Sequence, residues 1–194
     1  TGIAVTADIC GQQRVMVPKN SPIKGIKDLK GKTFATSTGT SVDIAFKAKI
    51  LPRHGLAEKD LKYLNLVSTD IVAALVSWNA DAGIVGDPQA EIALQKGLVR
   101  ELENFCPYDK TMMMHVGNPG TLKDNSEQYV KYFRGWLRAQ KLLKDDPEKY
   151  AKIYHESLVE VGDKTEYPIV LALMKRLDAN PQFDGDVRQN LKEM

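Results

Sequence analysis

The strongest constraint on the fold is a repeated order of strand and helix signals between residues 14 and 109. Short apolar and β-branched runs predict strands, at residues 14–18, 33–36, 61–67, 82–87 and 99–103. Helical spacing of apolar residues predicts helices at residues 42–50, 71–78 and 88–97, the second capped by Ser68 or Thr69. Strands alternating with helices of this length form βαβ units with right-handed crossovers. The sequence therefore predicts an α/β fold with a mostly parallel sheet.

The chain beyond this region continues with one more predicted strand, at residues 111–116, and then with helices only. These helices are expected at residues 125–146, 147–158, 166–177 and 184–194. The first of them carries an apolar stripe that includes Phe133, Trp136 and Leu137. Such a stripe must be buried against another element, yet the predicted sheet already has helices of its own. We therefore expect that part of the protein lies outside these 194 residues.

Composition excludes several classes of function. The net charge of +2 and the scattered basic residues give no reason to expect nucleic acid as a partner. No apolar run reaches the ~20 residues that a membrane-spanning helix needs. Cys10 and Cys106 lie far apart, without a CxxC pair or a nearby histidine pair, so no metal site is expected. We interpret both cysteines as small buried residues, with a disulfide as the alternative.

Two loops after predicted strands are candidates for a binding site, because ligands of parallel sheets bind at the carboxyl ends of strands. The first is STGTS, residues 37–41, which leads into a helix. A helix start offers unpaired N–H groups and a partial positive charge, and its hydroxyls can donate further hydrogen bonds to an anion. Serine and threonine are also common helix caps, so a cap and a ligand cradle are both open interpretations.

The second loop is Gly86, Asp87 and Pro88. The carboxylate of Asp87 could receive an ammonium or hydroxyl group of a ligand, or it could cap the helix that follows. Both interpretations remain open from the residues alone.

The order and spacing of four segments carry a resemblance to a known family. They are VPKNSPIKGIKDLKGKTFA, STGTS, ALVSWNADAGIVGDP and NSEQYVKYFRGWLRAQKLLKDDPEKYAKI. Together they resemble the solute-binding proteins of ABC importers for nitrate, sulfonates, taurine and thiamine precursors, which have a periplasmic-binding-protein type II-like fold. No single one of these segments is specific to that family.

The resemblance implies two α/β lobes, joined by crossing strands, that close on a ligand. Residues 14–109 would then form the complete second lobe, with residues 14–18 and 112–116 close to the hinge strands. Residues 1–13 and 110–194 would supply hinge strands and C-terminal helices that belong with a first lobe largely missing from this chain.

The resemblance also implies which residues hold the ligand. Its acidic group is expected near Thr38, Gly39, Thr40 and Ser41, and Asp87 is a further candidate. Many family members have Trp, Glu and Pro where this chain has Gly86, Asp87 and Pro88, so an aromatic wall is absent and a sulfonate preference is in doubt. Gln12 is a weaker candidate. His115 is another, although a hydrogen-bonded core histidine is its ordinary interpretation.

The predicted function is capture of a small polar or anionic organic molecule and its delivery to an ABC permease. The protein would work in the periplasm or on the outer side of the cell membrane, contacting the membrane only through the permease or a lipid anchor outside this chain. No cofactor is expected. Catalytic motifs such as a nucleophile elbow, HExxH or a P-loop do not occur, and the cysteine-rich motif of pyrimidine-forming enzymes with this fold is absent. The alternative is the ligand-sensing effector domain of a LysR-type transcriptional regulator.

Overall fold

The structure is a computed structural model that describes residues 2–8, 10–108 and 112–177. It divides into two compact units. Unit 1 consists of Thr1–Ile9 with Thr111–Met194, and unit 2 consists of Cys10–Lys110. Each unit is described by itself.

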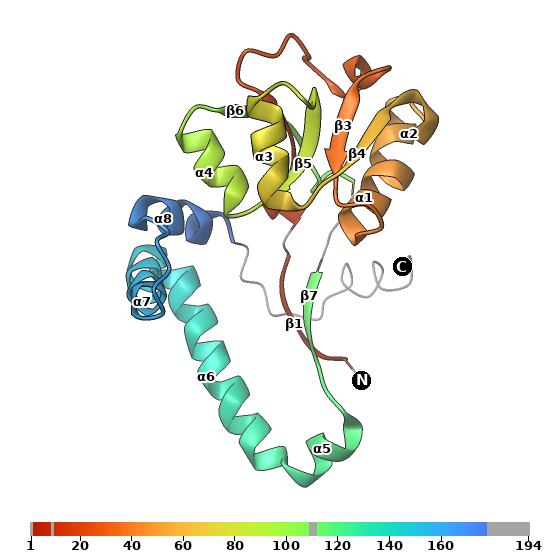
Figure 1. Ribbon diagram of the computed structural model, residues 1–194. Coiled ribbons are helices and arrows are strands. Elements are labelled where there is room, and N and C mark those ends of the chain that lie inside the picture. The colour runs from red at the N-terminus through yellow and green to blue at the C-terminus, as the bar shows by residue number, and fades with distance from the viewer. Residues whose placement is uncertain (1, 9, 109–111, 178–194) are drawn as a thin grey trace. The chain divides into compact units, whose positions relative to one another are not determined.

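Unit 2 is built on a five-stranded sheet with the strand order β4-β3-β5-β2-β6 (Figure 1). The strands are β2 (Gln13–Pro18), β3 (Thr33–Thr36), β4 (Lys62–Asn65), β5 (Ala82–Gly86) and β6 (Val99–Asn104). Strand β3 pairs in parallel with β4 and β5, whereas β2 is antiparallel to both β5 and β6. Strands β4, β3, β5 and β6 therefore run in one direction, and β2 alone runs in the other.

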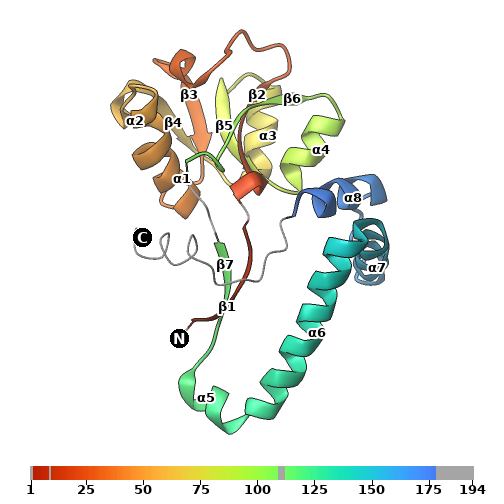
Figure 2. The same cartoon turned by 180° about the vertical axis from the view of Figure 1, so that it is seen from behind.

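Helices cover both faces of this sheet (Figures 1 and 2). One face packs under a continuous helical segment made of α1 (Ser41–Ala45), the π-helix Phe46–Ile50 and α2 (Leu51–Arg53). The other face packs under α3 (Ser68–Val76) and α4 (Gln89–Gln95). Short 3-10 turns complete the unit, at Cys10–Gln12, Ile26–Leu29 and Glu58–Asp60.

Alternation along the strands explains the two cores. Phe34 points to the α1 face, where its ring stacks on Phe46 with centroids 4.2 Å apart, while Ala35 points to the α3 face. In the same way Val15 and Met16 of β2 face opposite cores. A strand that is buried on both faces has a largely continuous apolar sequence, which is why the run RVMVP predicts a strand.

Unit 1 contains a two-stranded antiparallel sheet of β1 (Gly2–Asp8) and β7 (Met112–Val116). Four helices follow β7: α5 (Pro119–Asp124), α6 (Ser126–Asp145), α7 (Pro147–Glu160) and α8 (Tyr167–Arg176). Helix α7 packs against both α6 and α8. Asp146 caps α7 by accepting a hydrogen bond from the N–H of Lys149 at 3.0 Å, and Pro147 occupies the first helical position, as the sequence predicted.

The α/β fold class predicted from the sequence is confirmed, and two local expectations differ from the structure. The N-cap of α3 is Val67, with no side-chain cap from Ser68 or Thr69. Cys106 is exposed and disulfide-bonded, so the expectation of a buried thiol there is wrong and the alternative of a disulfide is correct. The strand predicted at residues 14–18 is β2, which lies inside the sheet of unit 2 between β5 and β6. The helix expected at residues 184–194 lies outside the described residues.

Candidate functional site

The carboxyl edge of the unit 2 sheet collects polar residues from four strands. Strands β3 and β5 are parallel neighbours in which Ala35 pairs with Gly83, so the loops that follow them leave the sheet at the same edge. The antiparallel strand β2 begins at this edge, where Gln13 pairs with Gly86, and β6 ends there. Residues 37–41, Asp87, Gln13 and Asn104 are thus brought together by the topology.

The loop 37–41 is held by hydrogen bonds to neighbouring residues. The Ser37 hydroxyl donates to the carbonyl of Leu66 at 3.0 Å, and the N–H of Thr38 donates to Oδ1 of Asn65 at 3.0 Å. Thr40 is the N-cap of α1, since its hydroxyl accepts from the N–H of Asp43 at 3.4 Å and donates to the carbonyl of Ser37 at 2.8 Å. The cap interpretation is therefore correct for Thr40.

The carboxylate of Asp43 anchors the loop 37–41 by a hydrogen bond. Its carboxylate is 2% exposed and accepts a hydrogen bond from the N–H of Gly39 at 3.0 Å. Gly39 has a φ of +82°, a conformation that glycine adopts without strain. Lys47 forms ion pairs with Asp43 at 3.2 Å and with Glu58 at 2.8 Å. Burial lowers the pKa of Lys47, but its bonds to the two carboxylates outweigh that effect and raise the pKa above its usual value.

The outer side of the same loop is open to solvent. Thr38, Gly39, Thr40 and Ser41 are all exposed. Among the described residues, no acceptor lies against the backbone N–H of Ser41 or Val42. Two N–H donors and the hydroxyls of Thr38 and Ser41 are therefore offered at the start of α1, which suits an anionic or strongly polar group. A helix cap at Thr40 is therefore chemically compatible with ligand binding by the neighbouring groups of the loop.

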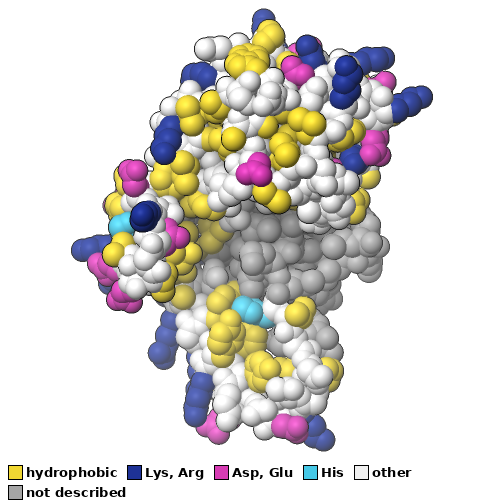
Figure 3. Space-filling view, in the orientation of Figure 1, with side chains coloured by type: hydrophobic (Ala, Val, Ile, Leu, Met, Phe, Trp, Pro, Cys, Tyr) yellow, Lys and Arg dark blue, Asp and Glu magenta, His cyan; other side chains and the backbone are white. Residues whose placement is uncertain are grey.

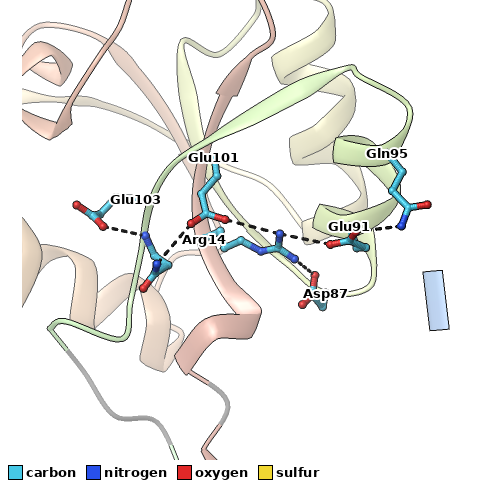
Figure 4. A network of polar contacts seen from close by, with 7 residues as sticks. Arg14, Asp87, Glu91, Gln95, Glu101 and Glu103 are labelled. Atoms are coloured by element: carbon cyan, nitrogen blue, oxygen red, sulfur yellow. Dashed lines mark hydrogen bonds and ion pairs between the residues drawn. The ribbon is translucent and has the colours of Figure 1, made fainter. Parts of the chain in front are cut away.

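Asp87 has a different environment from the exposed loop. Its side chain is 6% exposed, and it accepts a hydrogen bond from Nη2 of Arg14 (Figure 4). The N-cap position of α4 is Pro88, where no side-chain cap is formed, and the N–H of Asp87 donates to the carbonyl of Gln12 at 3.1 Å. Asp87 is thus a buried ion-pair partner at the end of β5.

Arg14 is the buried centre of a charged cluster that joins α4, β6 and the loop after β5. Its side chain is 1% exposed, and Nη1 lies 3.6 Å from Glu91 of α4 and 3.7 Å from Glu101 of β6. Each of these carboxylates is braced by an amide, Glu91 by Gln95 at 3.0 Å and Glu101 by Asn104 at 3.4 Å (Figure 4). Three carboxylates around one guanidinium leave this end of the sheet with excess negative charge when all are ionised.

The polar contacts continue from β6 towards α2. The backbone N–H of Asn104 donates to Glu103 at 3.1 Å, and Glu103 accepts from the Tyr108 hydroxyl at 3.1 Å. Nε2 of His54 lies 2.8 Å from the same hydroxyl. Burial raises the pKa of Tyr108, and the neighbouring carboxylate of Glu103 raises it further.

Gln12 and Gln13 lie beside Asp87 at the start of β2. Gln12 uses its backbone carbonyl to accept from Asp87, as described above. The Gln13 side chain lies over Gly86, since a Cβ at Gly86 would come within 3.2 Å of both polar atoms of its amide. Because Gly86 has no side chain, the amide of Gln13 can lie over it at the carboxyl edge of the sheet.

His115, the remaining predicted residue, belongs to unit 1. Its ring contacts the aromatic rings of three α6 residues edge-on, at centroid distances of 5.2–5.4 Å. These residues are Tyr132, Phe133 and Trp136. Nε2 is buried and has no hydrogen-bond partner among the described residues. A cavity of about 340 Å³ lies beside it, and Figure 3 shows hydrophobic side chains gathered between α6 and β7. The cavity is lined by His115, Val116, Gln128, Tyr129, Tyr132 and Phe133.

Sequence reasoning did not single out Arg14, Asp43 or Glu101. Arg14 stands inside an apolar strand, and a charged residue between buried positions is a signal that a partner must exist. Asp43 stands three residues after Thr40, which is the spacing of a capping interaction. Nothing in the sequence indicates which carboxylates would meet Arg14, because they come from α4, β6 and the loop after β5.

Comparison with known proteins identifies the family. The family model described as NMT1/THI5 like matches residues 10–150. The chain belongs to this family. It is 35% identical over 98 residues to a putative aliphatic sulfonates-binding protein of Escherichia coli (strain K12), a match that covers 50% of this chain and 30% of the relative.

Solved structures show the same fold. The periplasmic aliphatic sulphonate binding protein SsuA from Escherichia coli aligns with a TM-score of 0.82 at 22% identity, over 99% of this chain and 61% of SsuA. The desulfurization enzyme DSZB aligns with a TM-score of 0.70 at 13% identity, over 98% of this chain and 69% of DSZB. The chain thus spans less than two thirds of the length of both sulfonate-binding relatives. The fold is shared by binding proteins and by an enzyme.

No metal-binding group of three or more His, Cys, Asp or Glu side chains is found in the described ranges. A helix long and apolar enough to cross a membrane is likewise absent from residues 2–8, 10–108 and 112–177.

Proposed function

We propose that the full-length protein is an extracytoplasmic solute-binding protein that captures a small polar or anionic organic molecule and delivers it to an ABC import permease. Membership of the family and the names of the sulfonate-binding relatives support this role. The observation that carries it is the exposed loop 37–41, which offers N–H donors and hydroxyls at the carboxyl edge of a parallel strand pair.

In this proposal the ligand's anionic group binds Thr38, Gly39, Thr40 and Ser41, and Asp87, Gln12 and His115 contribute from other positions. Residues 14–109 form the second lobe. Residues 1–13 and 110–194 supply hinge strands and helices that pack on a first lobe, and ligand binding shifts the population towards a closed form that the permease recognises.

We place the protein on the periplasmic or extracellular side of the membrane. Disulfides persist in oxidising compartments, and Cys106 is disulfide-bonded. SsuA is named as periplasmic. Binding rather than catalysis is proposed because the family relatives are named as binding proteins, although DSZB shows that the same fold can support an enzyme.

A thermal-shift screen of the full-length protein tests the proposal. Nitrate, ethanesulfonate, taurine, pyrimidines and aromatic acids are added singly, and a ligand that binds only the folded state raises the melting temperature with its concentration. At a concentration 100 times Kd the stabilisation is about 2.7 kcal/mol. A complete screen without any concentration-dependent rise contradicts the proposed ligand class. Turnover of a bound compound, followed by chromatography, would contradict a pure binding role.

A further inference from the structure

A buried carboxylate is bonded to the loop 37–41, which is the loop proposed to bind an anion. The side chain of Asp43 is 2% exposed, and its Oδ2 accepts one backbone hydrogen bond, from the N–H of Gly39 at 3.0 Å. Its Oδ1 is buried and has no hydrogen-bond partner among the described residues. A carboxylate charge with so few donors is costly to bury, and it repels a second anion nearby. The site therefore needs a cation that compensates Asp43.

Lys47 supplies this compensating charge. Its Nζ lies 3.2 Å from Oδ2 of Asp43, four residues earlier in the same continuous helical segment. No other cationic side chain of the described residues forms an ion pair with Asp43. Lys47 also pairs with Glu58 at 2.8 Å, but Glu58 is 60% exposed and solvent screens that pair. The ammonium lies 4.5 Å from the ring centroid of Tyr63, a cation–π contact that helps to hold it in place.

The open donors of the loop are adjacent to this ion pair in the chain. The N–H groups of Ser41 and Val42, which face no acceptor among the described residues, belong to the two residues directly before Asp43. An anion that binds them lies close to the Asp43 carboxylate. The net charge that it meets there depends on whether Lys47 compensates Asp43.

We propose that Lys47 is a specificity-determining residue of the ligand site, which neutralises Asp43 and so allows the loop 37–41 to accept an anionic group. The inference rests on the proposed function, in which this loop binds the ligand. Without Lys47 the carboxylate of Asp43 would leave a negative charge beside the open N–H donors, and the loop would favour neutral polar groups instead.

Two probes of nearly the same shape and different charge measure this role. Ethanesulfonate is an anion, whereas ethanesulfonamide is neutral near neutral pH, and each is titrated calorimetrically into the full-length protein. The ratio of their Kd values gives the preference for the anion, and a general loss of structure weakens both probes alike. Lys47→Met keeps most of the aliphatic stem and removes the charge. It should lower the preference for ethanesulfonate by about tenfold or more, because Asp43 is then uncompensated.

Removal of the Asp43 charge should reverse the effect of Lys47→Met. Asparagine keeps an oxygen that accepts from the N–H of Gly39 but carries no charge. Asp43→Asn alone should raise the preference for ethanesulfonate. The double variant with Lys47→Met should return to within about threefold of the wild-type ratio, whereas two independent effects on the fold would add. A double variant that stays as low as Lys47→Met overturns the inference.

Two further variants separate position and charge from other effects. Lys30→Met is the matched control, since Lys30 is an exposed lysine that pairs with Asp60 at 4.0 Å and precedes β3, at the opposite end of that strand from the loop 37–41. It removes the same charge from the protein and should leave the ratio unchanged. Lys47→Arg keeps the charge and should keep the preference for ethanesulfonate. A loss in either variant as large as in Lys47→Met overturns the inference.

Asp43→Asn covers the case in which Lys47→Met does not fold. Its preference for ethanesulfonate should exceed that of the wild type, because the repelling charge is gone while Lys47 remains. An unchanged or lower ratio in Asp43→Asn would then overturn the inference.

A second measurement does not depend on any ligand. Burial lowers the pKa of Lys47, but its bonds to Glu58 and Asp43 outweigh this effect and raise the pKa above its usual value. The Cε signal of Lys47 is followed by NMR at alkaline pH, where the third group that faces the ammonium, Tyr63, stays neutral because burial raises its pKa. In Asp43→Asn the titration midpoint of Lys47 should fall by about one pH unit or more, since burial remains and one carboxylate is lost.

The two measurements distinguish the inference from the function on which it rests. An unchanged midpoint of Lys47 in Asp43→Asn overturns the inference even where both probes bind. A wild-type protein that binds neither probe contradicts the proposed ligand class instead, and the titration then decides by itself whether Lys47 compensates Asp43.

Discussion

The hydroxyl groups of the loop 37–41 divide into those that hold the loop and those that face solvent. Thr40 caps α1 and bonds to Ser37, whereas Thr38 and Ser41 have exposed side chains with no hydrogen bond to the described residues. The sequence shows that hydroxyls gather around Gly39, which is enough to predict a turn and a helix start. It does not show which hydroxyl is the cap, because that depends on the path of the loop over Asn65 and Leu66.

Alanine variants should separate the two roles of the loop. In the full-length protein Thr40→Ala should lower the free energy of unfolding by about 1 kcal/mol, the usual effect of a lost cap. Thr38→Ala and Ser41→Ala should leave unfolding unchanged and weaken binding of the identified ligand by about 1.5–3 kcal/mol for each lost bond to a charged group. Thermal unfolding without ligand and calorimetric titration measure the two effects. Full affinity in all three variants would reduce the loop to a helix cap.

Tyr63 shows how a single buried hydroxyl can limit stability. The hydroxyl of Tyr63 is buried and has no hydrogen-bond partner among the described residues. Burial raises the pKa of this phenol above its ordinary value of 10.0, and the charges of Glu58 and Asp43 raise it further. A folded-state pKa above the unfolded one gives stability that is present below pH 10 and is lost as the pH rises beyond it.

Tyr63→Phe should therefore leave stability at pH 7 equal or raise it by about 1 kcal/mol, because an unsatisfied hydroxyl is removed. Its advantage over the wild type should grow above pH 10. Chemical denaturation at pH 7 and pH 10.5 measures both. Tyr108→Phe is the control, since its hydroxyl bonds to His54 and Glu103 and its loss should destabilise at pH 7. Equal losses in the two variants would show that the Tyr63 hydroxyl has a partner in solution.

At the scale of the elements, periodicity predicted nearly every strand and helix that the structure describes in unit 2. The bounds of β3 agree at both ends, and β2, β4, β5 and β6 differ by one or two residues at most. The direction of β2 was not predictable, because apolar content is the same in parallel and antiparallel neighbours when both faces are buried. The charged network around Arg14 depends on this strand pairing, so its members could not be predicted from the sequence either.

The packing of α3 on the sheet depends on Gly83 in β5. A Cβ at this position would come within 2.7 Å of Ile71 and 2.8 Å of the carbonyl oxygen of Ala35. Gly83→Ala should destabilise the protein by about 1–3 kcal/mol, because the sheet or the helix must move. Gly135→Ala is the matched control on α6, where a Cβ meets nothing within 4 Å and alanine favours helix by about 1 kcal/mol. Urea denaturation of both variants provides the test. An equal change in the free energy of unfolding in the two variants would contradict the close approach of Ile71 and Ala35 to Gly83.

At the scale of the whole molecule, unit 1 differs from unit 2 in how well its apolar surface is covered. Leu143 of α6 is buried, yet Val130, Tyr132 and Leu137 of the same helix are 48%, 53% and 49% exposed. The cavity of about 340 Å³ lies against this helix and His115. The sequence already indicated a stripe in need of a cover. SsuA has the same fold over 61% of its length, which leaves 39% of SsuA without a counterpart in these residues.

We therefore expect the 194-residue chain to bind a hydrophobic dye or to self-associate, because exposed apolar patches of this kind drive association. A double variant with Val130→Gln and Leu137→Gln should lower dye fluorescence at unchanged far-UV circular dichroism. Val161→Gln is the control, since Val161 is 79% exposed but lies beyond α7, away from the cavity lining. A full-length protein should bind less dye per chain than the 194 residues do, because its first lobe would cover α6. A chain that is monomeric and binds no dye would show that unit 1 buries its own stripe.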